Sequence, residues 1–167
     1  RQRQMCIRDS YYKTNETVKA AVDKALEALS ALQRNDGGFG SWGTVNSESC
    51  AQVIVALTAL GIDPTADSRF VKNGLTVLDA LASFYVTGGG FRHTAGGDLD
   101  GMATEQGYYA LAAYYRFLNG QTSLYDMSDV TIQIDSHTHA FGAWTVTTPA
   151  TCTASGAETR TCACGET

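Results

Sequence analysis

The feature that most constrains the fold of this chain is a pattern of helix, glycine-rich turn and helix that occurs twice. Gly38-Phe39 marks the first turn, and Gly90-Phe91 follows 52 residues later in the second. Ser47-Glu48 starts the next segment and is matched by Thr104-Glu105 after 57 residues, which gives the second loop five extra residues. Internal repeats of this length are typical of arrays of helical hairpins.

The pattern predicts four helices, two amphipathic and two apolar nearly all round. Residues 14–33 and 67–85 carry apolar side chains three and four positions apart, the spacing of one helix face. Residues 47–60 and 104–118 are apolar on almost every side, which predicts burial on most sides. We therefore expect outer amphipathic helices that alternate with covered inner helices. A short strand is expected within residues 129–135.

Composition restricts the class of protein. The 167 residues, 44% of them hydrophobic, are enough for one domain with a core. The formal net charge of −5 argues against a nucleic-acid partner, because phosphate binding needs a basic face. No apolar run reaches the length of about 18 residues that a membrane-spanning helix requires, so no transmembrane segment is expected in this stretch.

The chain divides into four stretches by composition. Residues 1–10, RQRQMCIRDS, have no periodicity and resemble a translated sequencing-adapter scar at the end of a metagenomic gene fragment, so they are excluded from the fold prediction. Residues 11–127 hold the repeats, and residues 128–136 form a linker. Residues 137–167 are rich in threonine and contain three cysteines, which predicts a small separate module.

The first turn resembles the QW-type repeat of the squalene-cyclase and protein prenyltransferase superfamily. In that repeat a glutamine closes an outer helix, and a glycine-aromatic turn leads into an inner helix. The matching residues are Gln33, Gly37, Gly38, Phe39 and Trp42 in the first copy, and Gly89, Gly90 and Phe91 in the second. The second copy has no glutamine or tryptophan at the matching places.

The resemblance covers about residues 14 to 127 and implies an (α/α) toroid, the ring of helical hairpins found in terpenoid cyclases. The expected fold class is all-α: a partial toroid of alternating outer and inner helices with two helical hairpins, followed by a small β or irregular Cys-containing module. Repeat arrays need about three units for stability. We therefore expect further hairpins upstream of Tyr11.

The resemblance also implies a ligand cavity near the N-terminal ends of the inner helices, where backbone N–H groups carry partial positive charge. The expected lining residues are Glu48, Gln52, Glu105, Tyr108 and Tyr109. The two glutamates are either cavity acids or ordinary first-turn residues that follow the capping residues Ser47 and Thr104. The tyrosines either line the cavity, where aromatic rings stabilise cations, or belong to the core.

The catalytic motifs of the superfamily are not intact in this sequence. The acid motif of squalene–hopene cyclases is Asp-x-Asp-Asp, but here Asp98 and Asp100 are followed by Gly101 in a glycine-rich loop. Zinc prenyltransferases hold their metal with an Asp, a Cys and a His. Cys50 and His93 come from different repeats, and we expect a buried small hydrophobe and a loop residue, respectively.

The C-terminal stretch contains a candidate metal site. His139, Cys152, Cys162 and Cys164 could form a Cys₃His set for zinc, with His137 as the substitute for His139. A segment with so few apolar residues to bury needs a bound metal or a disulfide to stabilise its fold. The alternatives are a disulfide, for example between Cys152 and Cys162, or neither bond nor metal.

The run HAFGAWTVTTPATC and the Cys pair that follows resemble a short repeat of bacterial surface proteins, which implies a secreted or cell-surface protein. We expect a non-catalytic ligand-binding or display module whose partner is an unidentified small molecule or surface polymer. Two alternatives stay open: a terpenoid cyclase or prenyltransferase-type enzyme whose catalytic residues lie in other hairpins, and a carrier of a corrinoid-type ligand. Zinc in the C-terminal module is the one candidate cofactor.

Overall fold

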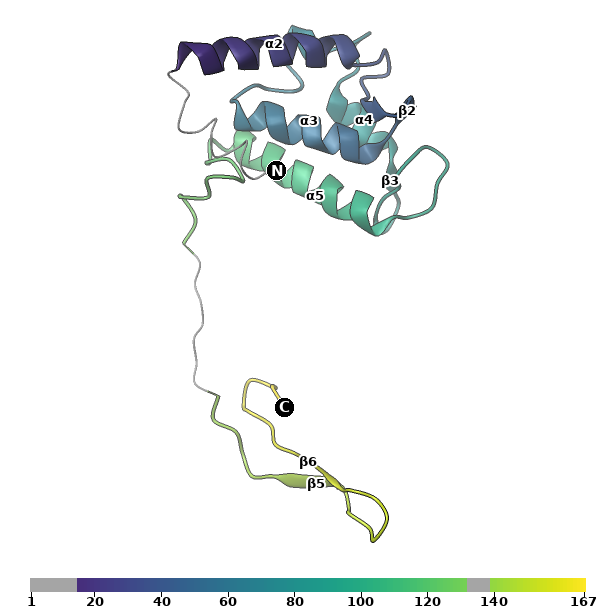
Figure 1. Cartoon of the computed structure of the whole chain (residues 1–167), viewed down its shortest axis with the longest axis vertical. Helices are drawn as coiled ribbons and strands as arrows, with labels where there is room; N and C mark the ends of the chain where they lie inside the picture. Colours follow the sequence, from purple (N-terminus) through teal and green to yellow (C-terminus); the bar gives the residue numbers. More distant parts are fainter. Residues whose placement is uncertain (1–14, 132–138) are drawn as a thin grey trace. The chain divides into compact units, whose positions relative to one another are not determined.

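The computed structural model describes residues 15–131 and 139–167 (Figure 1). They form two compact units, divided between Val130 and Thr131. We call the described parts the helical unit (15–130) and the tail module (139–167), and each is described by itself. The stretch 1–10, His137 and most of the strand expected within 129–135 lie outside the described residues, and residues 129–131 form no strand.

Within the described residues, the helical unit contains four α-helices with two small sheets between them. The helices are α2 (Glu16–Leu32), α3 (Ser47–Ala59), α4 (Val77–Ser83) and α5 (Gly101–Leu118). The antiparallel pairs are β1 (Gly40–Ser41) with β2 (Thr44–Val45), and β3 (Tyr85–Val86) with β4 (Gly90–Phe91). A third antiparallel sheet lies in the tail module. The expected all-α fold class is therefore wrong, and the fold is mixed α/β.

The sheets of the helical unit form because the glycine-rich turns fold back as tight hairpins. Trp42 and Gly43 have φ angles of 51° and 85° between β1 and β2, the positive values of a two-residue hairpin turn. Gly88, with φ of 92°, lies between β3 and β4. Strands of two residues leave no periodic signal in a sequence, which is why helical periodicity alone predicted an all-α unit.

The predicted helix over residues 67–85 is wrong in its first half. Ser68–Phe70 forms the short 3-10 helix η1, and α4 begins at Val77. Asn73 and Gly74 between them have φ angles of 52° and 79°. Such left-handed conformations do not continue a right-handed helix, so the segment turns before α4 starts.

The inner helix α3 is the centre of the helical unit, as its apolar sequence predicts. It contacts both α4 and α5, and Figure 1 shows it between α2 and α5. Its buried residues are Ser47, Cys50, Ala51, Val53, Ile54, Val55, Leu57 and Thr58. Burial of this helix removes a continuous apolar surface from water, which is the main driving force for the unit.

The second inner helix, α5, is fully buried on one narrow face only, and the prediction that it is buried on most sides is wrong. Its buried residues are all small: Ala103, Gly107, Ala110 and Ala113. A Cβ on Gly107 would collide with the Phe91 ring, so the close approach of α5 to β4 requires glycine. The exposed large side chains of α5 are Met102, Tyr108, Leu111, Tyr115 and Leu118.

The two inner helices are related by 54 residues, not by the 57 expected from Ser47-Glu48 and Thr104-Glu105. Asn46 caps α3 and Asp100 caps α5, each with a side-chain oxygen that accepts a backbone N–H. Each also donates its own N–H to the phenylalanine carbonyl of its turn, at 3.2 and 3.0 Å. The second loop therefore has two extra residues rather than five, and Ser47 and Thr104 are not the capping residues.

The tail module contains a β-hairpin supported by stacked side chains. β5 (Thr145–Thr148) pairs antiparallel with β6 (Ala157–Thr159). The Arg160 guanidinium lies 4.6 Å from the centre of the Phe141 ring and 4.7 Å from that of Trp144. These cation–π contacts hold the segment before β5 against the segment after β6.

None of the helices within residues 15–131 and 139–167 combines the length and hydropathy needed to cross a membrane.

Candidate functional site

Glu48 in the first turn of α3 is bound to the loop of the second repeat. His93 Nδ1 lies 2.8 Å from both carboxylate oxygens of Glu48. The Ser47 hydroxyl donates to the same carboxylate at 3.0 Å, and the Ser47 backbone N–H donates to the His93 carbonyl at 3.0 Å. Glu48 and His93 therefore link the two repeats, and His93 has a carboxylate partner rather than Cys50.

The predicted equivalence of Glu48 and Glu105 is not realised. With the inner helices related by 54 residues, Met102 occupies the position that corresponds to Glu48. Gln52 and Gln106 are equivalent, and they meet: Gln52 Nε2 donates to Gln106 Oε1 at 3.1 Å. Glu105 is exposed in the second turn of α5. The structure thus joins Glu48 and Gln52 to the second repeat but does not place Glu105 with them.

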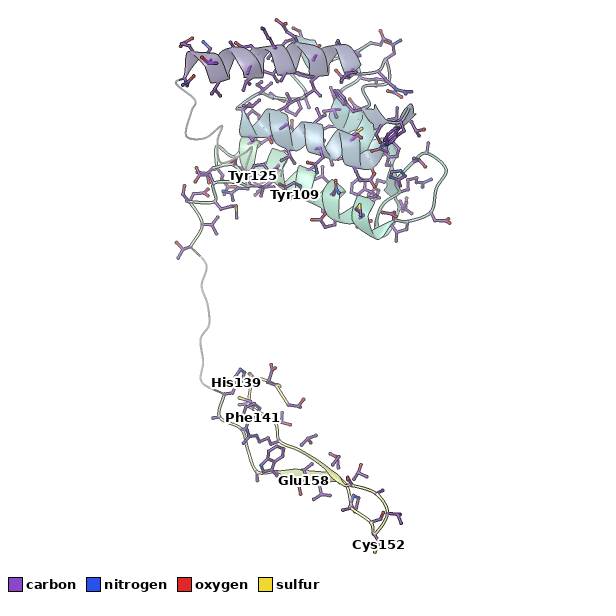
Figure 2. The ribbon with its side chains drawn as sticks, viewed as in Figure 1. Tyr109, Tyr125, His139, Phe141, Cys152 and Glu158 are labelled. Carbon is purple, nitrogen blue, oxygen red and sulfur yellow. The ribbon has the colours of Figure 1, made fainter. Side chains whose placement is uncertain are left out.

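Tyr108 and Tyr109 lie in different environments. Tyr108 is 48% exposed and packs edge-to-face with Phe91, with ring centres 5.7 Å apart. Tyr109 is half-buried against the core and contacts Tyr125, with ring centres 6.5 Å apart (Figure 2). The residues expected to line one cavity are therefore divided between the surface and the core.

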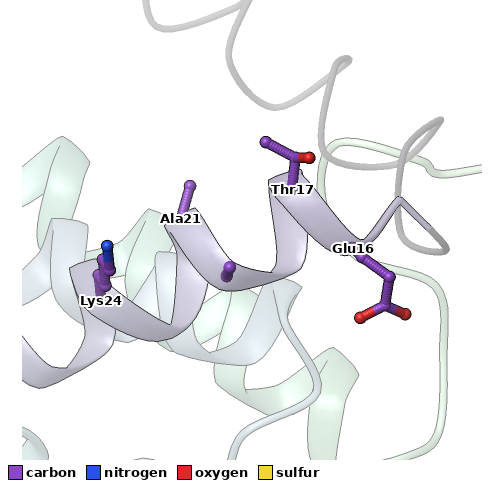
Figure 3. A pocket seen from close by; sticks show the side chains of 5 residues that line it. Glu16, Thr17, Ala21 and Lys24 are labelled. Carbon is purple, nitrogen blue, oxygen red and sulfur yellow. The ribbon is translucent and has the colours of Figure 1, made fainter.

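Two shallow depressions of the helical unit are lined by other residues. One is bounded by Arg34, Asn35 and Asp36, beside the first turn. The other lies on the first turns of α2 and is lined by Glu16, Thr17, Ala20, Ala21 and Lys24 (Figure 3). Both are open to solvent, and neither contains a predicted cavity residue.

The glycine-rich turn of the first repeat is held by Gln33. This buried side chain ends α2 and donates from Nε2 to the carbonyls of Gly37 at 2.9 Å and Phe70 at 2.8 Å. Gly37 has a φ of 79°, and a Cβ there would collide with the Thr76 carbonyl. A Cβ on Gly38 would come within 2.6 Å of the Val45 side chain. The turn therefore requires glycine at both positions.

Each turn phenylalanine is bound by one side chain of the following inner helix. The Phe39 N–H donates to Cys50 Sγ at 3.4 Å, and the thiol donates back to the Phe39 carbonyl at 3.7 Å. In the second repeat the Thr104 hydroxyl makes the same pair of bonds to Phe91, at 2.9 and 3.2 Å. Burial raises the pKa of the Cys50 thiol to about 11. Cys50 is thus a buried structural thiol, and its burial disfavours the thiolate form that binds metals.

Trp42 projects from the tip of the β1–β2 hairpin and is fully exposed. The hairpin is held by Arg34, whose guanidinium donates to the Gly43 carbonyl at 2.5 Å. The tryptophan of the QW-like pattern is therefore a surface residue in this structure.

The tail module brings three of the four predicted metal ligands together. His139, Cys162 and Cys164 place one ligand atom each within 4.8 Å of one another. Cys164 Sγ lies 3.4 Å from His139 Nδ1. Cys152 lies in the loop between β5 and β6, and Figure 2 shows it at the opposite end of the hairpin from His139. The predicted Cys₃His set is therefore a His/Cys/Cys group without Cys152, and this group could hold a metal ion.

Local backbone geometry builds this cluster. Cys162 forms an isolated antiparallel bridge with Phe141, which brings the chain close to His139. After Cys162 the chain turns sharply: Gly165 has a φ of 94°, and its N–H donates to the Cys162 carbonyl at 2.9 Å. This turn allows two cysteines separated by one residue to face the same point.

The cluster favours a thiolate at Cys162. A hydrogen bond from the Cys164 backbone, followed by those of the His139 and Cys164 side chains, lowers the pKa of Cys162 to about 6. Thiolates are the sulfur form that binds metals. A tetrahedral zinc with bonds of about 2.0–2.3 Å has ligand atoms roughly 3.3–3.8 Å apart. The distance of 3.4 Å between Cys164 Sγ and His139 Nδ1 falls in that range, and all three ligand atoms lie within 4.8 Å of one another.

Sequence reasoning missed the side chains that support this cluster. The His139 ring stacks on Phe141, with ring centres 5.6 Å apart, and Arg160 covers Phe141 and Trp144. The sequence did contain a signal for these contacts, since Phe141, Trp144 and Arg160 lie close in sequence to the His and Cys residues. Which side chains of the hairpin lie together depends on the pairing register of β5 and β6, and a threonine-rich sequence does not specify that register.

Comparison of the chain with protein-family models, with curated proteins and with solved structures gave no significant match. The sites are therefore assigned from geometry and chemistry alone.

Proposed function

We propose that this chain is a non-catalytic binding or display module of an exported bacterial cell-surface protein, in which the tail module is stabilised by zinc. The observation that carries the proposal is the convergence of His139, Cys162 and Cys164 in a small hairpin. A metal-stapled hairpin with its strands exposed is suited to presentation on a surface rather than to chemistry. The partner on this proposal is a small molecule or a surface polymer.

The composition of the tail module supports a structural role for the metal. Within residues 139–167, Cys162 is the one buried side chain, and every residue of β5 and β6 is exposed. Such a hairpin buries little apolar surface to offset its conformational entropy, so it is only marginally stable by itself. Zinc bound to a His/Cys/Cys group would add to that stability.

Zinc is favoured over a disulfide by the arrangement of the cysteines. Cys152, Cys162 and Cys164 are all free thiols. Cys162 and Cys164 gather with an imidazole, whereas Cys152, the partner in the alternative disulfide, lies away from them. Mixed imidazole and thiolate ligands are typical of zinc sites.

The zinc proposal is tested by metal analysis of matched cysteine variants. The full chain, purified with reductant and dialysed against zinc, should retain zinc, and Cys164→Ser should lose most of it. Cys152→Ser is the matched control and should bind zinc like the wild type. Equal zinc content in both serine variants, or none in the wild type, would contradict the proposal.

We also propose that the helical unit is related to the squalene-cyclase and prenyltransferase repeats that its first turn resembles. Support comes from Gln33, which joins the outer helix to the Gly-Phe turn, and from the same inner-helix contact at Cys50 and Thr104 in both repeats. A non-catalytic role predicts no turnover of squalene or isoprenoid diphosphates by the full chain. Detectable turnover that is lost in Glu48→Gln would support the enzyme alternative instead.

A further inference from the structure

The two outer helices differ in which of their equivalent residues are covered. The sequence ALEAL at residues 25–29 corresponds to VLDAL at residues 77–81, 52 residues later. Ala25, Ala28 and Leu32 in α2, which we call the α2 stripe, correspond to Val77, Ala80 and Phe84. The latter three are 0%, 6% and 3% exposed, whereas Ala25 and Ala28 are exposed and Leu32 is 71% exposed.

The inner helices show the complementary difference. Tyr108 and Leu111 of α5, which we call the α5 patch, correspond to Ile54 and Leu57 of α3 at the 54-residue spacing. Ile54 and Leu57 are fully buried, whereas Tyr108 and Leu111 are 48% and 38% exposed. The apolar surface of α5 continues onto the exposed Tyr115.

Inside the molecule these two kinds of face lie in one buried core. α3 contacts α4, and Ile54 and Leu57 belong to the same buried cluster as Val77 and Ala80 of α4 and as Phe84, which caps its C-terminal end. An inner helix of one repeat is thus covered by the outer helix of the next. The α5 patch and the α2 stripe are the corresponding two faces, and within the described residues both stay exposed, although Tyr108 also contacts Phe91.

We propose that the α5 patch of one copy of this chain binds the α2 stripe of a second copy, so that the α3–α4 interface is repeated between molecules. The partner is a second copy because the chain itself carries both halves of an interface that it already forms once internally. Large side chains on α5 would meet alanines on α2. The contact is heterologous, so it leaves one free face at each end of a dimer.

A glutamate in the α2 stripe tests the proposal. Sedimentation velocity over a concentration series should show wild-type association that Ala28→Glu weakens at least ~10-fold, because the new carboxylate would be buried beside apolar groups. Ala31→Glu is the matched control. Its counterpart Ser83 stays exposed at the end of α4, so this variant should associate like the wild type.

Mixing two variants distinguishes a head-to-tail contact from a symmetric one. Leu111→Glu should also weaken association at least ~10-fold, since it places a carboxylate in the α5 patch. Ala28→Glu keeps an intact α5 patch and Leu111→Glu keeps an intact α2 stripe, so an equimolar mixture should form dimers and no larger species. Circular dichroism of each variant shows whether the helices are intact.

The proposal would be overturned by a wild type that stays monomeric at all concentrations, by equal weakening from Ala28→Glu and Ala31→Glu, or by a folded mixture that does not pair. Association that Ala28→Glu leaves unchanged and Leu111→Glu abolishes would indicate a symmetric α5–α5 contact and would also contradict it.

Discussion

At the scale of single residues, the two repeats use different atoms for the same purpose. Cys50 and Thr104 each bind both backbone groups of a buried phenylalanine, one with a thiol and one with a hydroxyl. A hydroxyl makes the stronger hydrogen bond. The cysteine of the first repeat is therefore replaceable by threonine but not by an apolar residue of the same shape.

We expect Cys50→Val to lower the free energy of unfolding by about 1–2 kcal/mol relative to Cys50→Thr, because valine leaves the Phe39 N–H and carbonyl without partners. Urea unfolding of the two variants measures the difference. Since threonine and valine are nearly isosteric, their comparison removes the effect of side-chain size. Equal stability of the two variants would contradict the assigned role of Cys50.

Gly107 provides a second test at this scale. Gly107→Ala should destabilise the chain by about 1–3 kcal/mol, because the added methyl group would collide with the Phe91 ring. Gly101→Ala in the same helix is the control, since a Cβ there meets nothing within 4 Å. The melting temperature of Gly107→Ala should therefore fall, whereas that of Gly101→Ala should rise or stay unchanged. A Gly107→Ala variant as stable as Gly101→Ala would show that α5 does not pack closely on β4.

The thiol of Cys162 should titrate well below its usual range in metal-free protein. Its pKa is lowered to about 6 in the folded state from an unperturbed 9.0. Folding stability linked to this group is therefore fully present above about pH 9 and is lost as the pH falls toward 6. Ultraviolet absorbance of the thiolate during a pH titration measures the step, and Cys162→Ser should remove it. A single thiolate step near pH 9 would show that the cluster does not form without metal.

At the scale of elements, periodicity predicted the two helices with the clearest apolar pattern. Residues 14–33 and 47–60 agree with α2 and α3 to within two residues at each end. Residues 67–85 read as one helix because the apolar spacing continues through Asn73 and Gly74, whose left-handed backbone no periodicity reveals. The narrow buried face of α5 also escaped prediction, because burial depends on what covers a helix as well as on its sequence.

The left-handed backbone at Asn73 and Gly74 delays the start of α4 to Val77, and this start can be tested. Thr76 and Asp79 form a capping box, with the Thr76 hydroxyl accepting the Asp79 N–H at 3.2 Å and the carboxylate accepting the Thr76 N–H at 2.8 Å. Thr76→Ala should cost about 1 kcal/mol of stability, measured by denaturant unfolding. Thr17→Ala on the exposed first turn of α2 is the control and should cost less. If both variants unfold alike, α4 does not begin at Val77.

The candidate sites show the same division between what a sequence specifies and what it leaves open. The residue types of the tail cluster were predictable, because His139, Cys162 and Cys164 are close in sequence to one another or to the ends of one hairpin. The exclusion of Cys152 was not, since it follows from the β5–β6 pairing. The link from Glu48 to His93 joins residues 45 positions apart in different repeats, and no local spacing predicts it.

At the scale of the whole molecule, the chain consists of two units with different sources of stability. The helical unit has a continuous apolar core that includes residues of α2, α3, α4 and α5. The tail module has one buried cysteine, a stacked set of side chains and a group of candidate metal ligands. We therefore expect metal to govern the stability of the second unit and to leave that of the first unchanged.

Amide hydrogen exchange of the full chain, with zinc and with a chelator, tests this account most directly. We predict that zinc slows exchange within residues 139–167, above all around Cys162, and leaves the exchange rates of α3 unaltered. Cys152→Ser should behave like the wild type. Identical exchange of residues 139–167 with zinc and with chelator would contradict the claim that a metal at His139, Cys162 and Cys164 stabilises the tail module.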